Sequence, residues 1–237
     1  MNIPNIKGFL PLSMLDWPEK VTSVIFLGGC SFRCPACHNH GLVLAPESYK
    51  DQPLEQVIDF LRERTKWIDG VTITGGEPTC HEGTPELISK FRDLGLNVKL
   101  DTNGANPTML EELIQRRLID AVSMDIKAPL ETGLYSKLAG VSVNLRNIKR
   151  SIQLLKSSGL SVFFRTTVIP GLIGENELDR IRDELGSVPR YSIQRFRNIE
   201  TLDPEFGQIP DLDLESFDAL QLKFEQPGLG CRTFYTN

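Results

Sequence analysis

The sequence has no long hydrophobic run and no excess of positive charge. None of its apolar stretches approaches the ~20 residues that a membrane-spanning helix needs, and residues 1–7 lack the apolar core of a secretory signal. The formal net charge is -5, which argues against nucleic acid or a membrane surface as the main partner. We therefore expect a soluble, cytoplasmic protein.

Cysteine is also scarce, and its placement excludes a disulfide framework. Of five cysteines in the chain, Cys30, Cys34 and Cys37 form a C-x3-C-x2-C motif. Thiolates this close together on one loop indicate a soft-metal site, either zinc or iron–sulfur. A structural zinc site takes four protein ligands, usually in two separated pairs, and the sequence contains no second pair. A [4Fe–4S] cluster held by three thiolates instead leaves one iron open to another ligand.

Strand-like and helix-like segments alternate from residue 21 onward. Short β-branched runs predict parallel strands at 21–27, 71–74, 97–101, 121–125, 161–168 and 191–194. A 3.6-residue apolar period predicts helices at 53–66, 84–94, 107–117, 145–158, 177–185 and 214–224. The expected N-caps of the last four are Asn106, Asn144, Asn176 and Asp213. Six βα units in strict alternation indicate an α/β fold with right-handed crossovers.

The chain after residue 20 is shorter than the ~250 residues that a closed eight-unit barrel typically takes. We therefore expect a partial, open (βα)6 barrel of the TIM-like kind. Residues 1–20 contain three prolines, so we expect a short N-terminal extension that forms a hairpin or loop. The chain 1–237 is expected to be a single domain, with residues 21–237 as its core.

Polar side chains follow the predicted strands at the points where the strands end. Because the carboxyl ends of parallel strands meet at one edge, these side chains and the cysteine motif should share one barrel mouth. Turn chemistry alone would account for the glycines, but it accounts less well for the charged residues. The set comprises Gly75, Gly76, Glu77, Asp101, Thr102, Asn103, Asp125, Lys127 and Arg165.

The chemistry of this set indicates a ligand with an amino group, a carboxylate and a ribose. The two glycines would let the ligand approach the backbone closely, and Glu77 offers a carboxylate to an amino group. Asp101 and Thr102 carry oxygens suited to ribose hydroxyls or to a cation that bridges to a carboxylate. Lys127 and Arg165 can neutralise a ligand carboxylate. If the amino acid end of the ligand binds the open iron, the ligand is an aminoacyl nucleoside.

The cysteine motif after the first strand and Gly-Gly-Glu-Pro after the second, on six βα units, resemble the radical S-adenosylmethionine (SAM) superfamily. The resemblance implies that Cys30, Cys34 and Cys37 bind a [4Fe–4S] cluster, with the amino and carboxylate groups of SAM on its fourth iron. It also implies that one electron breaks the sulfonium–C5′ bond. The products are methionine and a 5′-deoxyadenosyl radical that abstracts hydrogen.

Further motifs resemble the activating enzymes of glycyl-radical enzymes. They are CPACHN at 34–39, LDTNG at 100–104 and MDIK at 124–127. Segments within 8–18, 164–171 and 194–206 resemble the branch of anaerobic ribonucleoside-triphosphate reductase activating proteins. The resemblance therefore implies a glycyl radical made on such a partner, with reduced flavodoxin or ferredoxin as the electron donor.

The resemblance also implies residue roles. Gly76 and Glu77 would meet the methionyl amino group, and Lys127 and Arg165 would face the cofactor or its carboxylate. Positions that match Asp101, Thr102, Asp125 and the Ser123 carbonyl hold a monovalent cation in pyruvate formate-lyase activase, so such a cation is a further expected cofactor. The remaining expected cofactor contacts are Ala36, Cys37, His38, Asn39, Gly75 and Asn103.

Some features stay open at this point. That activase has a histidine after the sixth strand, whereas this chain has Gln194, Arg195 and Arg197, so the late cofactor contacts are not assigned. Cys80 and Cys231 have no expected role, and His38 is expected to pack or to contact a ligand rather than bind metal. The alternative functions are a radical SAM enzyme that modifies a small molecule or peptide, and a zinc-bound regulatory or scaffold module.

Overall fold

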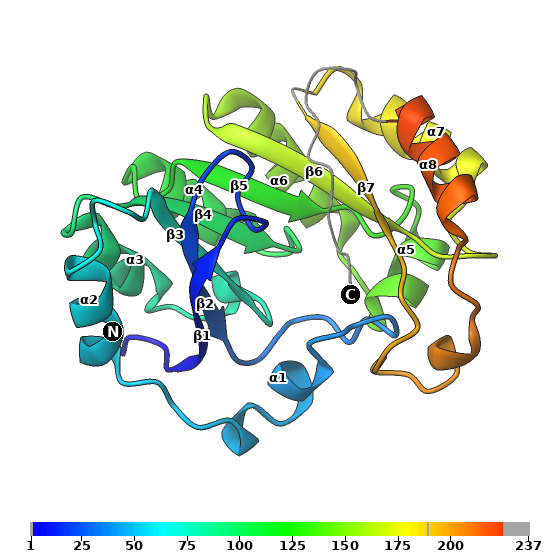
Figure 1. Cartoon of the computed structure of the whole chain (residues 1–237). Coiled ribbons are helices and arrows are strands. Elements are labelled where there is room, and N and C mark those ends of the chain that lie inside the picture. The colour runs from blue at the N-terminus through cyan, green and yellow to red at the C-terminus, as the bar shows by residue number, and fades with distance from the viewer. Residues whose placement is uncertain (1, 189, 225–237) are drawn as a thin grey trace.

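The computed structural model describes residues 2–188 and 190–224, and within them one sheet has the order β1-β2-β3-β4-β5-β6-β7. Figure 1 shows these strands side by side in chain order, with helices around the outside of the sheet. All neighbours after the first pair are parallel: β2 (Thr22–Leu27), β3 (Gly70–Gly75), β4 (Asn97–Thr102), β5 (Ala121–Asp125), β6 (Ser161–Val168) and β7 (Tyr191–Arg195). Among the described residues no pairing joins β1 to β7. The predicted strands and the open (βα)6 barrel are therefore confirmed.

The N-terminal extension adds a strand to this sheet. β1 (Ile6–Ser13) pairs antiparallel with β2, which makes the hairpin expected before residue 21. Behind β1, Trp17 is 4% exposed and packs with Ala121 and Phe163. Since Ala121 begins β5, the extension fills the end of the barrel opposite the mouth.

Alternation along the strands separates an apolar face from a polar one. Leu27, Ile73, Leu100 and Met124 belong to the main hydrophobic core under the helices. The residues that alternate with these along the strands face the interior of the barrel and include Lys99, Asp101, Asp125 and Arg165. The strand register places Asp125 opposite Arg165. The inner face of the barrel therefore carries its charges toward the carboxyl ends of β4, β5 and β6.

The helices largely follow the prediction. Those predicted are α2 (Leu54–Arg62), α3 (Thr84–Arg92), α4 (Pro107–Gln115), α6 (Leu145–Ser157), α7 (Glu175–Leu185) and α8 (Leu214–Phe224). Asn106, Asn144 and Asp213 accept from backbone N–H groups of the first turns as expected. Within the described residues no helix is both long and apolar enough to cross a bilayer.

The bounds of two predicted helices are wrong, and two further helices were missed. α7 starts before Asn176, because Glu177 reaches back to accept from the Gly174 N–H at 3.0 Å and closes the first turn there. α2 ends at Arg62, short of residue 66. Two helices were not predicted, α1 (His40–Leu44) and α5 (Thr132–Ala139). Both are short, so neither shows a long apolar period.

Candidate functional site

A pocket of about 300 Å³ opens at the carboxyl ends of the strands, and we call it the mouth pocket. Its lining includes nearly every residue that the sequence predicts for the site. These are Cys30, Cys34, Ala36, Cys37, His38, Asn39, Gly75, Gly76, Glu77, Asp101, Thr102, Asn103, Asp125, Lys127 and Arg165. Ser123 is the exception: it is 2% exposed, pairs with Asp101 and Phe163 inside the sheet, and does not belong to the lining.

The mouth pocket also contains residues that the sequence reasoning missed. They are Phe32, Val43, Leu138 and Ile169. Thr74 and Thr167 lie toward the ends of strands, where the strand-end rule places them, and Gln194, left unassigned by the sequence, also lines the pocket. Val43 and Leu138 come from the two unpredicted helices, and no sequence signal pointed to them.

Residues 28–39, the cysteine loop, are held in place by backbone contacts with several elements. The Arg33 N–H donates to the Ala139 carbonyl at the end of α5, at 2.8 Å. Gly140 follows with φ +66°, and a Cβ there would lie 1.9 Å from the Arg33 carbonyl oxygen. On another side of the loop, the Asp203 N–H donates to the Pro35 carbonyl at 3.0 Å. The unpredicted helix α5 therefore has a clear role, because its end supports the cysteines.

The two glycines after β3 are required for contact with the cysteine loop. A Cβ at Gly76 would lie 1.8 Å from the Gly29 carbonyl oxygen, and one at Gly75 would lie 2.3 Å from that of Leu27. The close approach allows the Gly76 and Glu77 N–H groups to donate to Leu27 and Gly29, each at 2.8 Å. The expected reason for these glycines was approach of a ligand, but the contact that excludes a side chain is with the protein's own backbone.

The Glu77 carboxylate is 1% exposed and its oxygens are taken by the protein. Oε1 accepts from the Thr79 and Thr102 hydroxyls at 2.6 and 2.7 Å, and Oε2 accepts from the Asn103 N–H at 2.6 Å. The side chain therefore ties the end of β3 to the end of β4. These bonds leave the expected pairing between this carboxylate and a ligand amino group without support in the geometry.

The three cysteines lie at one pocket, where burial disfavours the thiolate form. Burial raises the pKa of Cys30 to about 12 and raises those of Cys34 and Cys37, with Lys127 partly opposing the rise at Cys34. A buried thiolate therefore needs a positive partner, which an iron–sulfur core supplies when it displaces the protons. Within the part of the chain that the structure describes, no group of three or more His, Cys, Asp or Glu side chains is gathered tightly enough to hold a single metal ion.

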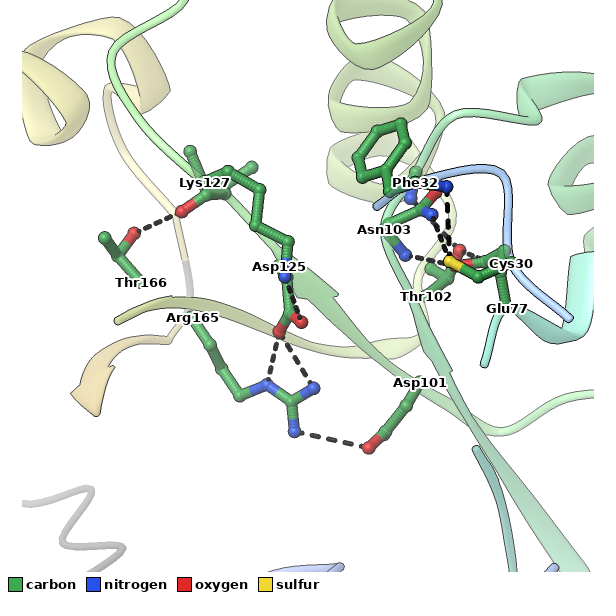
Figure 2. Close-up of polar contacts among 12 residues, drawn as sticks. Cys30, Phe32, Glu77, Asp101, Thr102, Asn103, Asp125, Lys127, Arg165 and Thr166 are labelled. Atoms are coloured by element: carbon green, nitrogen blue, oxygen red, sulfur yellow. Dashed lines mark hydrogen bonds and ion pairs between the residues drawn. The ribbon is translucent and has the colours of Figure 1, made fainter. Parts of the chain in front are cut away.

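Two donors are directed at the sulfur of Cys30, as Figure 2 shows. The Phe32 N–H lies 3.3 Å from Sγ and the Asn103 side-chain amide lies 3.7 Å from it. Hydrogen bonds to ligand sulfurs are one of the means by which a protein sets the potential of an iron–sulfur cluster. Asn103, expected as a cofactor contact, therefore lies beside the Cys30 thiol.

A network of alternating charges forms the opposite side of the mouth pocket. The Arg165 guanidinium lies between two carboxylates (Figure 2), with Nε and Nη2 at 3.0 and 2.9 Å from Asp125 Oδ1 and Nη1 at 3.3 Å from Asp101 Oδ2. Lys127 Nζ donates to Asp125 Oδ2 at 3.0 Å, and Lys99 Nζ donates to Asp101 Oδ1. The network is thus continuous from β4 across β5 to β6.

Burial and pairing act against each other within this network. Burial alone raises the pKa of Asp125, but Arg165 and Lys127 outweigh it and hold this pKa below its ordinary range. Burial lowers and Asp125 raises the pKa of Lys127, with a net rise. The pKa of Lys99 is lowered because burial exceeds the attraction of Asp101. The network therefore keeps Asp125 ionised in a site that is largely shielded from water.

Two histidines, His38 and His81, link the cysteine loop to other segments through contacts with backbone carbonyl groups. His38 Nε2 lies 2.7 Å from the Arg197 carbonyl, and its ring stacks on Phe196 with centroids 6.4 Å apart. His81 Nε2 lies 2.7 Å from the Gly28 carbonyl. The geometry agrees with packing for His38 and gives His81 a partner that the sequence did not reveal.

The two cysteines outside the motif differ in what can be said of them. Cys80 is a free, exposed cysteine. Cys231 lies outside the described residues.

Comparison with known proteins identifies the family to which the chain belongs. A model of the radical SAM superfamily matches residues 24–184. A Methanocaldococcus jannaschii protein named as a glycyl-radical enzyme activating enzyme is 33% identical over 86% of this chain and 85% of its own length. The pyruvate formate-lyase-activating enzyme of Clostridium pasteurianum is 24% identical over 95% of this chain and 90% of its own.

A solved structure supports the fold. Streptococcus suis SuiB bound to S-adenosylmethionine superposes with a TM-score of 0.64 at 17% identity, over 82% of this chain and 44% of SuiB. The chain thus spans less than half the length of that protein, and the likeness shows the architecture alone. With the family model covering most of the sheet from β2 to β6, the cysteine loop and most of the mouth pocket, the chain belongs to the radical SAM superfamily.

Proposed function

We propose that this protein is an activating enzyme that makes a glycyl radical on a partner protein. The carrying observation is the mouth pocket, which has the three cysteines on one side and the Asp101–Arg165–Asp125–Lys127 network on the other. The names of the relatives support the same activity, since several are activating enzymes of glycyl-radical enzymes or of pyruvate formate-lyase.

In this proposal Cys30, Cys34 and Cys37 hold a [4Fe–4S] cluster, and the mouth pocket takes SAM. The cluster and SAM together supply the chemistry: one electron cleaves SAM reductively to methionine and a 5′-deoxyadenosyl radical, which abstracts hydrogen from a glycine Cα. The chain itself positions the ligand. Lys127 and Arg165 carry positive charge toward the methionyl carboxylate, while Ala36, His38 and Asn39 lie beside the cofactor as part of the lining.

The proposed partner is anaerobic ribonucleoside-triphosphate reductase, on the basis of the sequence segments that resemble its activating proteins. The proposed electron donor is reduced flavodoxin or ferredoxin, and the proposed compartment is the cytoplasm. A single domain with an open sheet, in which no described pairing joins β1 to β7, fits this role because an open barrel can admit a loop of the partner.

The test begins with the cluster reconstituted anaerobically, followed by addition of reductant, SAM and each glycyl-radical enzyme of the source organism. The expected result is a glycyl-radical EPR doublet with one partner, and loss of that doublet when the partner's radical glycine is changed to alanine. If 5′-deoxyadenosine forms but no partner gives a doublet, the protein instead modifies a small molecule or peptide, and the proposed activity is wrong.

A further inference from the structure

A lysine is buried in the barrel directly beneath the mouth pocket. Lys99 is 1% exposed, lies on β4 two residues before Asp101, and points its ammonium group at Asp101 Oδ1. It does not belong to the lining of the pocket, so the proposed function gives it no task. Because an ammonium group is rarely buried without a reason, its position calls for one.

Each oxygen of the two carboxylates already accepts from a protein cation. Asp101 Oδ1 is taken by Lys99 and Oδ2 by Arg165, at 3.3 Å for the latter. Asp125 Oδ1 is taken by Arg165 at 2.9 Å and Oδ2 by Lys127 at 3.0 Å. Arg165 therefore occupies the space between the carboxylates in which a bridging metal ion would have to lie.

The other two ligands expected for a monovalent cation, Thr102 and Ser123, either bond to the protein itself or lie outside the pocket. The Thr102 hydroxyl donates to Glu77 at 2.7 Å and accepts from the Gly104 N–H at 3.1 Å. Ser123 lies within the sheet and outside the pocket lining. Alkali ions need several free oxygen ligands, as other hard cations do. The residues present therefore do not fit the monovalent cation that the family resemblance implies.

The charge balance leads to the same result. Three cations, Lys99, Arg165 and Lys127, face Asp101 and Asp125, and Asp16 also attracts Lys99. The carboxylates are therefore already balanced by protein cations. An added metal ion would bring a further positive charge next to Lys99 and Arg165, at a cost that grows in a medium of low dielectric constant.

We propose that Arg165, lying between Asp101 and Asp125 with Lys99 on the other oxygen of Asp101, takes the place of a monovalent metal ion, so that the mouth pocket binds the carboxylate of its ligand without sodium or potassium. This inference rests on the proposed function for the identity of the ligand as SAM. Lys99 acts through Asp101 and Arg165, and is therefore a positioning residue.

The experiment measures SAM binding by calorimetry to the cluster-loaded protein, without reductant so that SAM stays intact. Buffers of equal ionic strength contain potassium, sodium or tetramethylammonium chloride. The wild-type protein should bind equally well in all three. Lys99→Met should bind SAM roughly tenfold more weakly in tetramethylammonium, because the Asp101 Oδ1 atom then has no positive partner. Potassium or sodium should restore the affinity by taking the place of the ammonium group. Lys90→Met, at an exposed position on α3, is the matched control and should behave as wild type.

Two results would overturn the inference. One is a several-fold loss of wild-type affinity in tetramethylammonium, which would mean that a metal ion is required. The other is wild-type affinity of Lys99→Met in tetramethylammonium, which would mean that the ammonium charge has no role. The wild-type measurement decides the matter even if Lys99→Met fails to fold. Absence of SAM binding in every salt would instead refute the proposed function.

Discussion

Asp125 remains ionised inside the barrel because cations surround it. Burial raises its pKa, but Arg165 and Lys127 outweigh burial and the pKa lies below its ordinary range. A carboxyl group with a depressed folded pKa stabilises the protein above its unfolded pKa of ~3.9, and this contribution is lost as the pH falls through the folded value. The wild-type protein should therefore keep this contribution from neutral pH down to about pH 4.

Changing Arg165 to Gln should remove that protection. Without the guanidinium, burial is opposed by Lys127 alone, so the pKa of Asp125 rises. The free energy of unfolding falls by on the order of 3 kcal/mol at pH 7, because the buried carboxylate has lost a positive partner. The difference in thermal midpoint between the variant and wild type should shrink as the pH falls from 7 to 4, because protonation of Asp125 in the variant removes its poorly compensated buried charge. Arg150→Gln, which breaks the more exposed pair with Glu111, should change stability by at most about 1 kcal/mol. Parallel pH profiles for Arg165→Gln and wild type would contradict the network as described.

The Asn103 amide should influence the electrons of a cluster rather than its assembly. Its contact with Cys30 Sγ at 3.7 Å favours the more negative, reduced cluster, so Asn103→Ala should make the reduction potential more negative. A hydrogen bond worth about 1 kcal/mol corresponds to roughly 40 mV for one electron. Redox titration followed by EPR measures the shift. Asn97→Ala, at the far end of β4, is the control, and an unchanged potential in Asn103→Ala would show that the amide does not act on the sulfur.

Between elements, the tightest fit joins the turn after β3 to the cysteine loop. Gly76→Ala would bring a Cβ to 1.8 Å from the Gly29 carbonyl oxygen, so one of the two backbones must move. We expect a loss of on the order of 3 kcal/mol in stability and a lower iron content after anaerobic reconstitution. Gly133→Ala in α5 meets no atom within 4 Å, and it should be neutral or stabilising by up to about 1 kcal/mol. Full iron loading of Gly76→Ala would contradict the proposed dependence of the cysteines on this contact.

The strands and the longer helices could be predicted because their signals are local. The run at 161–168 is β-branched and aromatic, and Asn144 caps the helix that begins at Leu145. α1 and α5 could not be predicted, since they are stabilised by what they touch. α5 contains Gly133 and shows no strong apolar stripe, yet its last carbonyl, that of Ala139, receives the Arg33 N–H. Tertiary contact of this kind leaves no periodic pattern in the sequence.

For the molecule as a whole, the position of the site followed from topology. Parallel strands bring their carboxyl ends to one edge, so Glu77, Asp101, Asp125 and Arg165 could be placed together before any contact was known. What each side chain does there could not be predicted. Glu77 ties the end of β3 to the end of β4, and Arg165 lies between two carboxylates, because buried groups take the nearest partners in three dimensions.

The central claim is that Cys30, Cys34 and Cys37 hold a cluster at which SAM is cleaved in the mouth pocket. The most direct measurement is the amount of 5′-deoxyadenosine formed by the anaerobically reconstituted protein with reductant and SAM. Wild type should form it together with methionine, Cys80→Ala should form a similar amount, and Cys34→Ala should form none. Product from Cys34→Ala, or none from a wild-type protein with a full complement of iron, would contradict the claim.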